Sequence, residues 1–186
     1  LTYLSSRGIG PDWYDFMYSS SKVWDVYQRL LIPFYWRGEV VGFTGRMFEE
    51  SNGVKYYTDV WPGYVFNMDA QDWTRKFVIV TEGPFDAITV SGVSILGSEI
   101  NDTQRELIDG LGRRVIVVPD RDAPGEKLIG QAKEFGWSVA FPEWGDDVND
   151  VADAVAKYGR LFVLQSILKT AESNKLKIDL KRKMYG

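Results

Sequence analysis

Hydrophobic and polar residues alternate between strand-like and helix-like patterns through the second half of the chain. Short apolar runs, several of them rich in the β-branched residues that favour strands, occupy residues 77–81, 93–96, 114–118 and 137–141. Helix signals separate these runs: Pro84 opens 84–91, Asn101 or Asp102 caps a segment through Ile108, Gly136 follows 123–135, and Asn149 caps a segment ending near Gly159. This alternation predicts an α/β fold with a mainly parallel sheet covered by helices on both faces.

Acidic residues follow three of the predicted strands at the point where each strand ends. Glu82 comes after the first strand, Asp120 and Asp122 after the third, and Asp146, Asp147 and Asp150 lie beyond the fourth. The carboxyl ends of parallel strands meet at one edge of a sheet, where working sites lie. So many carboxylates at one edge repel one another unless cations are present. The sequence therefore predicts a divalent metal site and a substrate that carries phosphate.

The first 72 residues predict a small mixed α+β subdomain. Residues 31–35 and 39–43 read as a hairpin around Arg37 and Gly38, and residues 54–58 as a further strand after the turn Ser51, Asn52, Gly53. We expect this subdomain to place basic side chains toward the acidic edge, with aromatic rings beside them on which nucleic-acid bases can stack. Most aromatic rings in a small domain nevertheless fill its core. The candidate binding residues are Arg29, Arg37, Arg46, Lys55 and Tyr56.

Residues 159–186 predict a short helical segment followed by a connector. Leu161, Leu164, Ile167 and Leu168 recur at helical spacing and are expected to pack on the rest of the protein. The spacing weakens after Thr170, and the alternation that follows fits a strand as well as a helix. We therefore expect residues 174–186 to be a loosely attached connector whose deletion costs little stability and leaves the chemistry in place.

Composition narrows the chemistry further. The 186 residues include no cysteine and no histidine, so thiol nucleophiles, zinc sites and histidine acid–base catalysis are excluded, and oxygen ligands point to Mg²⁺ or Mn²⁺. No apolar run is long enough for a membrane span, which predicts a soluble, cytoplasmic protein. The chain begins with Leu1 rather than Met, so we expect it to be cut from a longer one.

Acids after strands also have structural explanations, and other protein classes place them there too. Any one aspartate after a strand is more often a turn or helix-capping residue than a ligand, and this holds for Asp146 and Asp153 taken singly. A response-regulator receiver would need an acidic pair after the first strand and a lysine after the last. A phosphatase with a nucleophilic aspartate would need the DxD pair after the first strand, whereas Asp120 and Asp122 follow the third.

Three motifs together resemble the Toprim domain. The segments VIVTEGPFDAI, VVPDRDAPG and DDVND contain Glu82, the pair Asp120 and Asp122, and the later acids Asp147 and Asp150, in the order of that family's acidic motifs. The preceding segments YLSSRGI and RLLIPFYWRGEVVGFTGRMFEESNGVKYYT resemble the region before Toprim in DnaG-type and phage primases. The resemblance covers nearly the whole chain.

The resemblance implies a DNA primase core, a nucleotidyltransferase that makes short RNA primers from nucleoside triphosphates on a single-stranded DNA template in a bacterial or phage-infected cell. It implies catalytic roles for Glu82, Asp120 and Asp122, metal ligation by these and by Asp147 or Asp150, and two or more Mg²⁺ or Mn²⁺ ions. The basic residues named above would hold template and triphosphate. A replicative helicase, fused or separate, would be a partner.

The implied organisation is an N-terminal subdomain over 1–72, a Toprim domain over 73–158 and a C-terminal segment over 159–186. Primases of this family usually carry a zinc-binding module, which a chain without cysteine cannot form. A Toprim nuclease that hydrolyses phosphodiesters and a non-catalytic module that binds single-stranded DNA remain as alternatives. A topoisomerase would need a nucleophilic tyrosine in a further domain.

Overall fold

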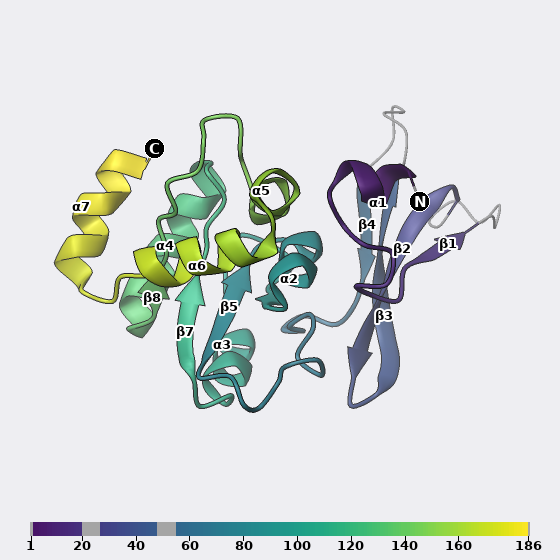
Figure 1. Ribbon diagram of the computed structural model, residues 1–186. Coiled ribbons are helices and arrows are strands. Elements are labelled where there is room, and N and C mark those ends of the chain that lie inside the picture. Colours follow the sequence, from purple (N-terminus) through teal and green to yellow (C-terminus); the bar gives the residue numbers. More distant parts are fainter. Residues whose placement is uncertain (1, 20–26, 48–54, 186) are drawn as a thin grey trace.

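The computed structural model describes residues 2–19, 27–47 and 55–185, and it contains two four-stranded sheets (Figure 1). The antiparallel N-terminal sheet has the order β1-β2-β3-β4, and the parallel sheet has the order β6-β5-β7-β8. The strands are β1 (Met17–Ser19), β2 (Arg29–Trp36), β3 (Glu39–Met47), β4 (Tyr56–Asp59), β5 (Phe77–Thr81), β6 (Val93–Ser94), β7 (Arg114–Val117) and β8 (Ser138–Val139). The helices are α1 (Thr2–Ser6), α2 (Pro84–Val90), α3 (Asp102–Asp109), α4 (Ala123–Phe135), α5 (Val151–Tyr158), α6 (Arg160–Thr170) and α7 (Lys175–Tyr185).

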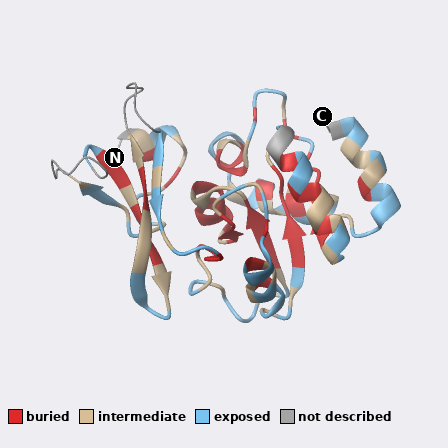
Figure 2. Ribbon diagram, turned by 180° about the vertical axis from the view of Figure 1, so that it is seen from behind, coloured by how far each residue is buried: buried red, intermediate tan, exposed pale blue. Residues whose placement is uncertain are grey.

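The parallel sheet is covered on both faces, as its continuous apolar strands predict. Successive side chains of β5 point to opposite faces: Val78 and Val80 pack in a core with α3, α4 and α7, whereas Ile79 packs in a second core with α2, α5 and α6. Figure 2 shows the buried residues concentrated in these strands and in the helices beside them. The predicted α/β class and parallel sheet are therefore confirmed.

The helix ends follow the capping residues closely. Asn101 caps α3 in a reciprocal arrangement with Gln104, and Gly136 ends α4 in a left-handed conformation with φ of 77°. One cap was predicted wrongly: Asp150, rather than Asn149, caps α5, because the Asp150 carboxylate accepts a hydrogen bond from the Asp153 N–H at 2.7 Å. The strands predicted at 93–96 and 137–141 are shorter in the structure, with only two residues paired in each.

The N-terminal sheet packs its inner face against α2. Leu30, Ile32 and Phe34 alternate along β2 and share a third core with Phe85 and Ile88 of α2. The hairpin between β2 and β3 turns at Arg37 and Gly38, whose φ values of 53° and 81° match the turn that tight hairpins favour. The predicted hairpin is confirmed, the further strand is β4, and the turn at residues 51–53 lies outside the described residues. This packing brings the N-terminal sheet beside the carboxyl end of β5.

The C-terminal segment is attached more firmly than the sequence predicted. Residues 175–185 form helix α7, and Ile178 is fully buried in the core that also contains Leu128 of α4. An antiparallel bridge between Val139 and Glu172 adds the preceding segment to the edge of the sheet. The expectation of a loosely attached connector was wrong. Among the residues of α7 whose burial is described, 175–184, only Ile178 is buried, and one buried position leaves no helical repeat in the sequence.

Helix α6 also differs from its prediction. Val163 and Ile167 are buried, Leu164 is partly buried, and Leu161 and Leu168 are exposed. The buried face of α6 therefore includes Val163 instead of the predicted Leu161 and Leu168. None of the helices in the described ranges combines the length and apolar character needed to cross a membrane.

Candidate active site

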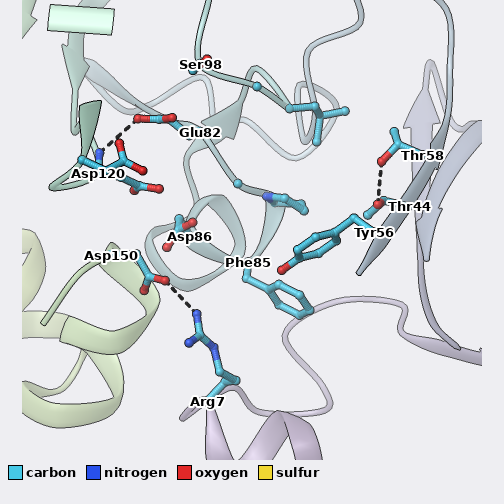
Figure 3. Close-up of a pocket in the computed structure, with 15 residues that line it drawn as sticks. Arg7, Thr44, Tyr56, Thr58, Glu82, Phe85, Asp86, Ser98, Asp120 and Asp150 are labelled. Carbon is cyan, nitrogen blue, oxygen red and sulfur yellow. Dashed lines mark hydrogen bonds and ion pairs between the residues drawn. The ribbon is translucent and has the colours of Figure 1, made fainter. Parts of the chain in front are cut away.

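A pocket of about 480 Å³ opens where the carboxyl ends of β5 and β7 meet the N-terminal sheet (Figure 3). One side of the pocket carries acids that follow β5 and β7, cap α4 and α5, or lie in the first turn of α2. The other side carries the hydroxyl groups of Thr44, Tyr56 and Thr58 from β3 and β4. The carboxylates that line the pocket are Glu82, Asp86, Asp120, Asp122 and Asp150.

Glu82 and Asp120 lie on neighbouring strand ends and are joined by a hydrogen bond. The Asp120 backbone N–H donates to the Glu82 carboxylate over 3.2 Å. Burial raises the pKa of Glu82, and the charge of Asp122 adds to the effect. Burial also raises the pKa of Asp120, and with the repulsion of Asp86, Glu82 and Asp150 brings it to about 8. These two carboxyls are thus poised to gain from a nearby cation.

Asp122 belongs to a tight strand-to-helix turn. Its carboxylate caps α4 by accepting a hydrogen bond from the Gly125 N–H at 2.9 Å. A Cβ atom at Gly125 would lie 2.2 Å from the carbonyl oxygen of Asp120, so only glycine fits there. The sequence DAPG after Asp120 therefore holds both aspartates at the pocket.

Asp86 is a pocket residue that sequence analysis missed. It lies in the first turn of α2, four residues after Glu82, and its carboxylate accepts a hydrogen bond from the Ala152 N–H at 2.9 Å. Burial and then the charge of Asp150 raise the pKa of Asp86 to about 7. The sequence feature that could have identified Asp86 is its place inside the segment EGPFDAI. An acid in the first turn of a helix is usually explained by the helix dipole alone.

Arg7 is the second residue that was missed, and it fixes the position of Asp150. Its guanidinium donates hydrogen bonds to Asp150 at 2.9 Å and to Asp153 at 2.6 Å, which join the turn after α1 to α5. Burial opposes the charge of Arg7, but the two carboxylates hold the pKa of Arg7 above its ordinary value. Arg7 is thus a cation at the edge of the acidic pocket.

Asp147 does not join the other acids. Its side chain is 70% exposed and forms an ion pair with Lys157 of α5, and the hydrogen bond from Lys157 lowers the pKa of Asp147. Asp147 lies outside the pocket lining, and Asp146 does too. Of the later acids Asp146, Asp147 and Asp150, the structure brings only Asp150 to the pocket.

Arg46, Lys55 and Tyr56 form the basic and aromatic side of the site. The Arg46 guanidinium lies 4.9 Å from the ring centres of both Tyr3 and Tyr56 and hydrogen-bonds to the Tyr56 hydroxyl. The Lys55 ammonium lies 5.9 Å from the Tyr56 ring centre. Because Tyr56 lines the pocket, these two cations lie at its margin.

Arg29 and Arg37 are not placed as expected. Arg29 is buried under the N-terminal sheet, where it donates hydrogen bonds to the carbonyl oxygens of Gly45 at 3.0 Å and Lys55 at 3.3 Å. Arg37 lies in the β2–β3 turn, with its guanidinium 5.9 Å from the centre of the Trp36 ring. Neither residue lines the acidic pocket. An arginine inside a strand pattern cannot be distinguished from a surface cation by spacing alone.

The donor set suits a hard divalent cation. All five acidic side chains offer oxygen atoms, the ligands that Mg²⁺ and Mn²⁺ prefer. Burial first, and then repulsion between neighbouring carboxylates, raises the pKa values of Glu82, Asp86 and Asp120. Within the described residues, no three acidic side chains already converge closely enough to form a finished metal site. The carboxylates therefore fit such an ion by chemistry and charge, and binding would require their side chains to turn toward it.

The raised pKa of Asp120 predicts how stability varies with pH in the metal-free protein. A carboxyl with a higher pKa in the folded state binds more protons when folded, so stability should fall as the pH rises from 3.8 toward about 8. We expect a lower melting temperature at about pH 8 than at about pH 5, and added Mg²⁺ should reduce the difference. Asp120→Asn should flatten the dependence; an unchanged slope in this variant would show that Asp120 is not responsible.

Comparison with solved structures places this fold among primases. The zinc-binding and RNA polymerase domains of the Aquifex aeolicus primase match with a TM-score of 0.74 and 22% identity, over 92% of this chain and 55% of that chain. A DnaG primase catalytic domain bound to single-stranded DNA matches with a TM-score of 0.73 and 17% identity, over 92% of this chain and 73% of that chain. The primase fragment of the bacteriophage T7 primase-helicase protein matches with a TM-score of 0.68 and 16% identity, over 88% of this chain and 73% of that chain.

Comparison of the sequence with protein-family models and with curated proteins finds no match. The chain spans little more than half of the Aquifex aeolicus primase structure, at 55%. At identities of 16% to 22% the likeness concerns architecture rather than individual residues. The two sheets and their covering helices have the fold of the DnaG-type primase catalytic core.

Proposed function

We propose that this protein is the catalytic core of a DNA primase, which joins ribonucleoside triphosphates into short RNA primers on a single-stranded DNA template. The observation that carries the proposal is the pocket in which five carboxylates meet beside a basic and aromatic wall. The likeness to primase cores supports the same activity. We also propose a replicative helicase, fused or separate, as a partner, since one similar structure comes from a primase-helicase protein.

In this proposal the acidic side of the pocket holds Mg²⁺ or Mn²⁺. Glu82, Asp120 and Asp122 would be the ligands, with Asp150 beside them. Such ions orient a triphosphate and make a 3′-hydroxyl easier to deprotonate. Arg7 keeps Asp150 in place, and the hydrogen bond from Ala152 to Asp86 keeps the start of α5 against α2.

The opposite wall would hold the substrates. Arg46 is kept between two tyrosine rings, so its guanidinium is ordered before any phosphate arrives. Lys55 adds a second positive charge, and the exposed Tyr56 ring offers a surface on which a base can stack. The acids thus attract the metals while this wall attracts the phosphates of the triphosphate and the template.

Incubation with labelled ribonucleoside triphosphates, a single-stranded DNA template and Mn²⁺ tests the proposal. Metal-dependent oligoribonucleotides are the expected product. Shortened DNA would indicate a Toprim nuclease, which uses the same metals. DNA binding with neither product would indicate a non-catalytic replication module. A chelator should abolish these products, since no histidine or cysteine can take over the chemistry.

Single-stranded DNA binding should depend on Arg46 and Lys55. We expect Arg46→Ala and Lys55→Ala each to weaken binding and to lower the slope of log affinity against log salt by about 0.7, because each removes one phosphate contact. Titrations of a labelled oligonucleotide at several salt concentrations measure both quantities. Arg37→Ala is the matched control, since Arg37 lies outside the pocket. Equal effects of all three substitutions would show that net charge, rather than this wall, controls binding.

A further inference from the structure

A second group of cations lies at the edge of the parallel sheet opposite the acidic pocket. Strands β5 and β7 begin there in register, with Phe77 opposite Arg114, and run side by side in the same direction (Figure 1). Glu82 and Asp120, which line the pocket, follow their carboxyl ends. The two edges are separated by the length of these strands, about 15 Å. We call the group the basic edge; its members are Arg75, Lys76, Arg113 and Arg160.

Two of these arginines meet at one residue. Arg75 donates a hydrogen bond to the Ser91 carbonyl oxygen at 3.1 Å, and Arg160 donates one to the Ser91 hydroxyl. Burial lowers the pKa of Arg160, and the nearby charge of Arg75 lowers it further. Two guanidinium groups held together in this way repel each other, so their arrangement favours an anion beside them.

Acids of the described chain do not neutralise the basic edge. None of its four side chains takes part in any ion pair between described residues. Asp72 lies within electrostatic range: hydrogen bonds from Thr74 lower its pKa most, and the charges of Arg75 and Arg113 add to this. One terminal nitrogen of Arg113, Nη1, is buried without a hydrogen-bond partner. The positive charge therefore exceeds the negative charge at this edge.

An exposed tryptophan stands beside these cations. Residues 72–75 form a turn closed by the hydrogen bond from the Arg75 N–H to the Asp72 carbonyl oxygen at 3.1 Å. Trp73 lies in this turn with 85% of its surface exposed. The Asp72 carboxylate accepts hydrogen bonds from the Thr74 N–H at 2.8 Å and the Thr74 hydroxyl at 2.7 Å, which keep the turn in shape. A large ring held in solvent beside positive charges is a stacking surface for an unpaired base.

We propose that the basic edge and Trp73 form a second binding site for single-stranded nucleic acid, separate from the acidic pocket. The cations contact successive phosphates, and Trp73 stacks on a base. The choice of nucleic acid over an acidic protein follows from the exposed aromatic ring beside arginines, a combination that suits bases alternating with phosphates. That the bound strand is the primase template rests on the proposed function. That this site binds single-stranded nucleic acid does not depend on it.

Fluorescence anisotropy with labelled oligo-dT of increasing length tests this site without nucleotide or metal. Trp73→Ala should weaken binding of the longer oligonucleotides about fivefold or more, the loss of one stacking contact. Arg113→Ala and Lys76→Ala should each lower the salt slope by about 0.7. Lys127→Ala is the control, because Lys127 is an exposed cation of α4 paired with Glu99. Circular dichroism melts verify that the variants remain folded.

The outcomes separate this site from the proposed catalysis. Wild-type affinity and salt slope in Trp73→Ala and Arg113→Ala would overturn the second site, as would a wild-type protein that does not bind oligo-dT. Stronger dependence on Lys127 than on Arg113 would also overturn it. If the variants bind less tightly but the wild-type protein makes no oligoribonucleotides, the second site stands and the primase proposal fails.

Discussion

Asp120→Asn is expected to abolish primer synthesis while leaving the fold intact. Asp120 lies at the end of β7 among four other pocket carboxylates, and its pKa of about 8 reflects burial and their combined repulsion. Asparagine keeps the shape of the side chain but removes the charge that would bind a metal. Substituting a residue that hydrogen-bonds to a metal ligand commonly lowers activity or metal affinity by about 10- to 100-fold. Loss of a residue that binds the metal directly should therefore cost more.

The stability of this variant should move in the opposite direction from its activity. The ionised Asp120 carboxylate is repelled by its neighbours, so its removal should leave the melting temperature unchanged or raise it near pH 8. Primer synthesis measured with labelled triphosphates, together with a thermal melt, distinguishes a lost ligand from a lost fold.

Asp147→Asn is the matched control for Asp120→Asn. It makes the same chemical change on a residue that is exposed, paired with Lys157 and outside the pocket. We expect nearly full activity in this variant. Wild-type turnover by Asp120→Asn, with unchanged metal dependence, would show that the metal site lies elsewhere. Loss of activity in Asp147→Asn alone would return that residue to the site.

The parallel sheet was the part of the fold that the sequence predicted best. Its strands are buried on both faces, so they appear as uninterrupted runs of apolar, mostly β-branched residues such as 115–118. Glycine and capping residues mark the helix ends at Gly136 and Asn101. Both signals are local, so they need no knowledge of the rest of the structure.

The candidate site was predicted only where a residue's role follows from its place at a strand end. Glu82, Asp120 and Asp122 follow β5 and β7, and the parallel sheet brings them together. Arg7 reaches the same pocket from the turn after α1 and Asp86 from the first turn of α2, and their hydrogen bonds join residues 146 and 66 positions apart in the sequence. Contacts of this kind depend on how the two halves pack, which spacing along the chain does not reveal.

Arg29 is a residue that the sequence predicted at the site but that the structure places elsewhere. It begins β2 in a run of apolar residues, and the sequence suggested a surface cation. The structure buries it, with backbone carbonyl oxygens of Gly45 and Lys55 as acceptors. A buried charge is tolerated when hydrogen bonds satisfy it, and the partners come from β3 and the residue before β4. Those partners become neighbours only when the N-terminal sheet forms.

Ile178→Ala should be the most destabilising alanine substitution in helix α7. The Ile178 side chain is fully buried between α7 and the core that contains Leu128, Ala132 and Val139. Replacing a buried isoleucine by alanine removes apolar contacts and leaves a cavity, at a cost of about 2–5 kcal/mol. The ion pairs Lys133–Asp179 and Arg182–Glu126 are partly exposed and should contribute much less.

Leu180→Ala is the control on the same helix, because Leu180 is 56% exposed and its truncation should change stability by no more than about 0.5 kcal/mol. Urea denaturation of both variants measures the difference. Deletion of residues 174–186 removes Ile178 together with its helix, so it should destabilise at least as much as Ile178→Ala. Equal stability of the two point variants, or a deletion that costs nothing, would mean that α7 detaches in solution. In that case the loosely attached connector predicted from the sequence would describe the protein better than the docked helix does.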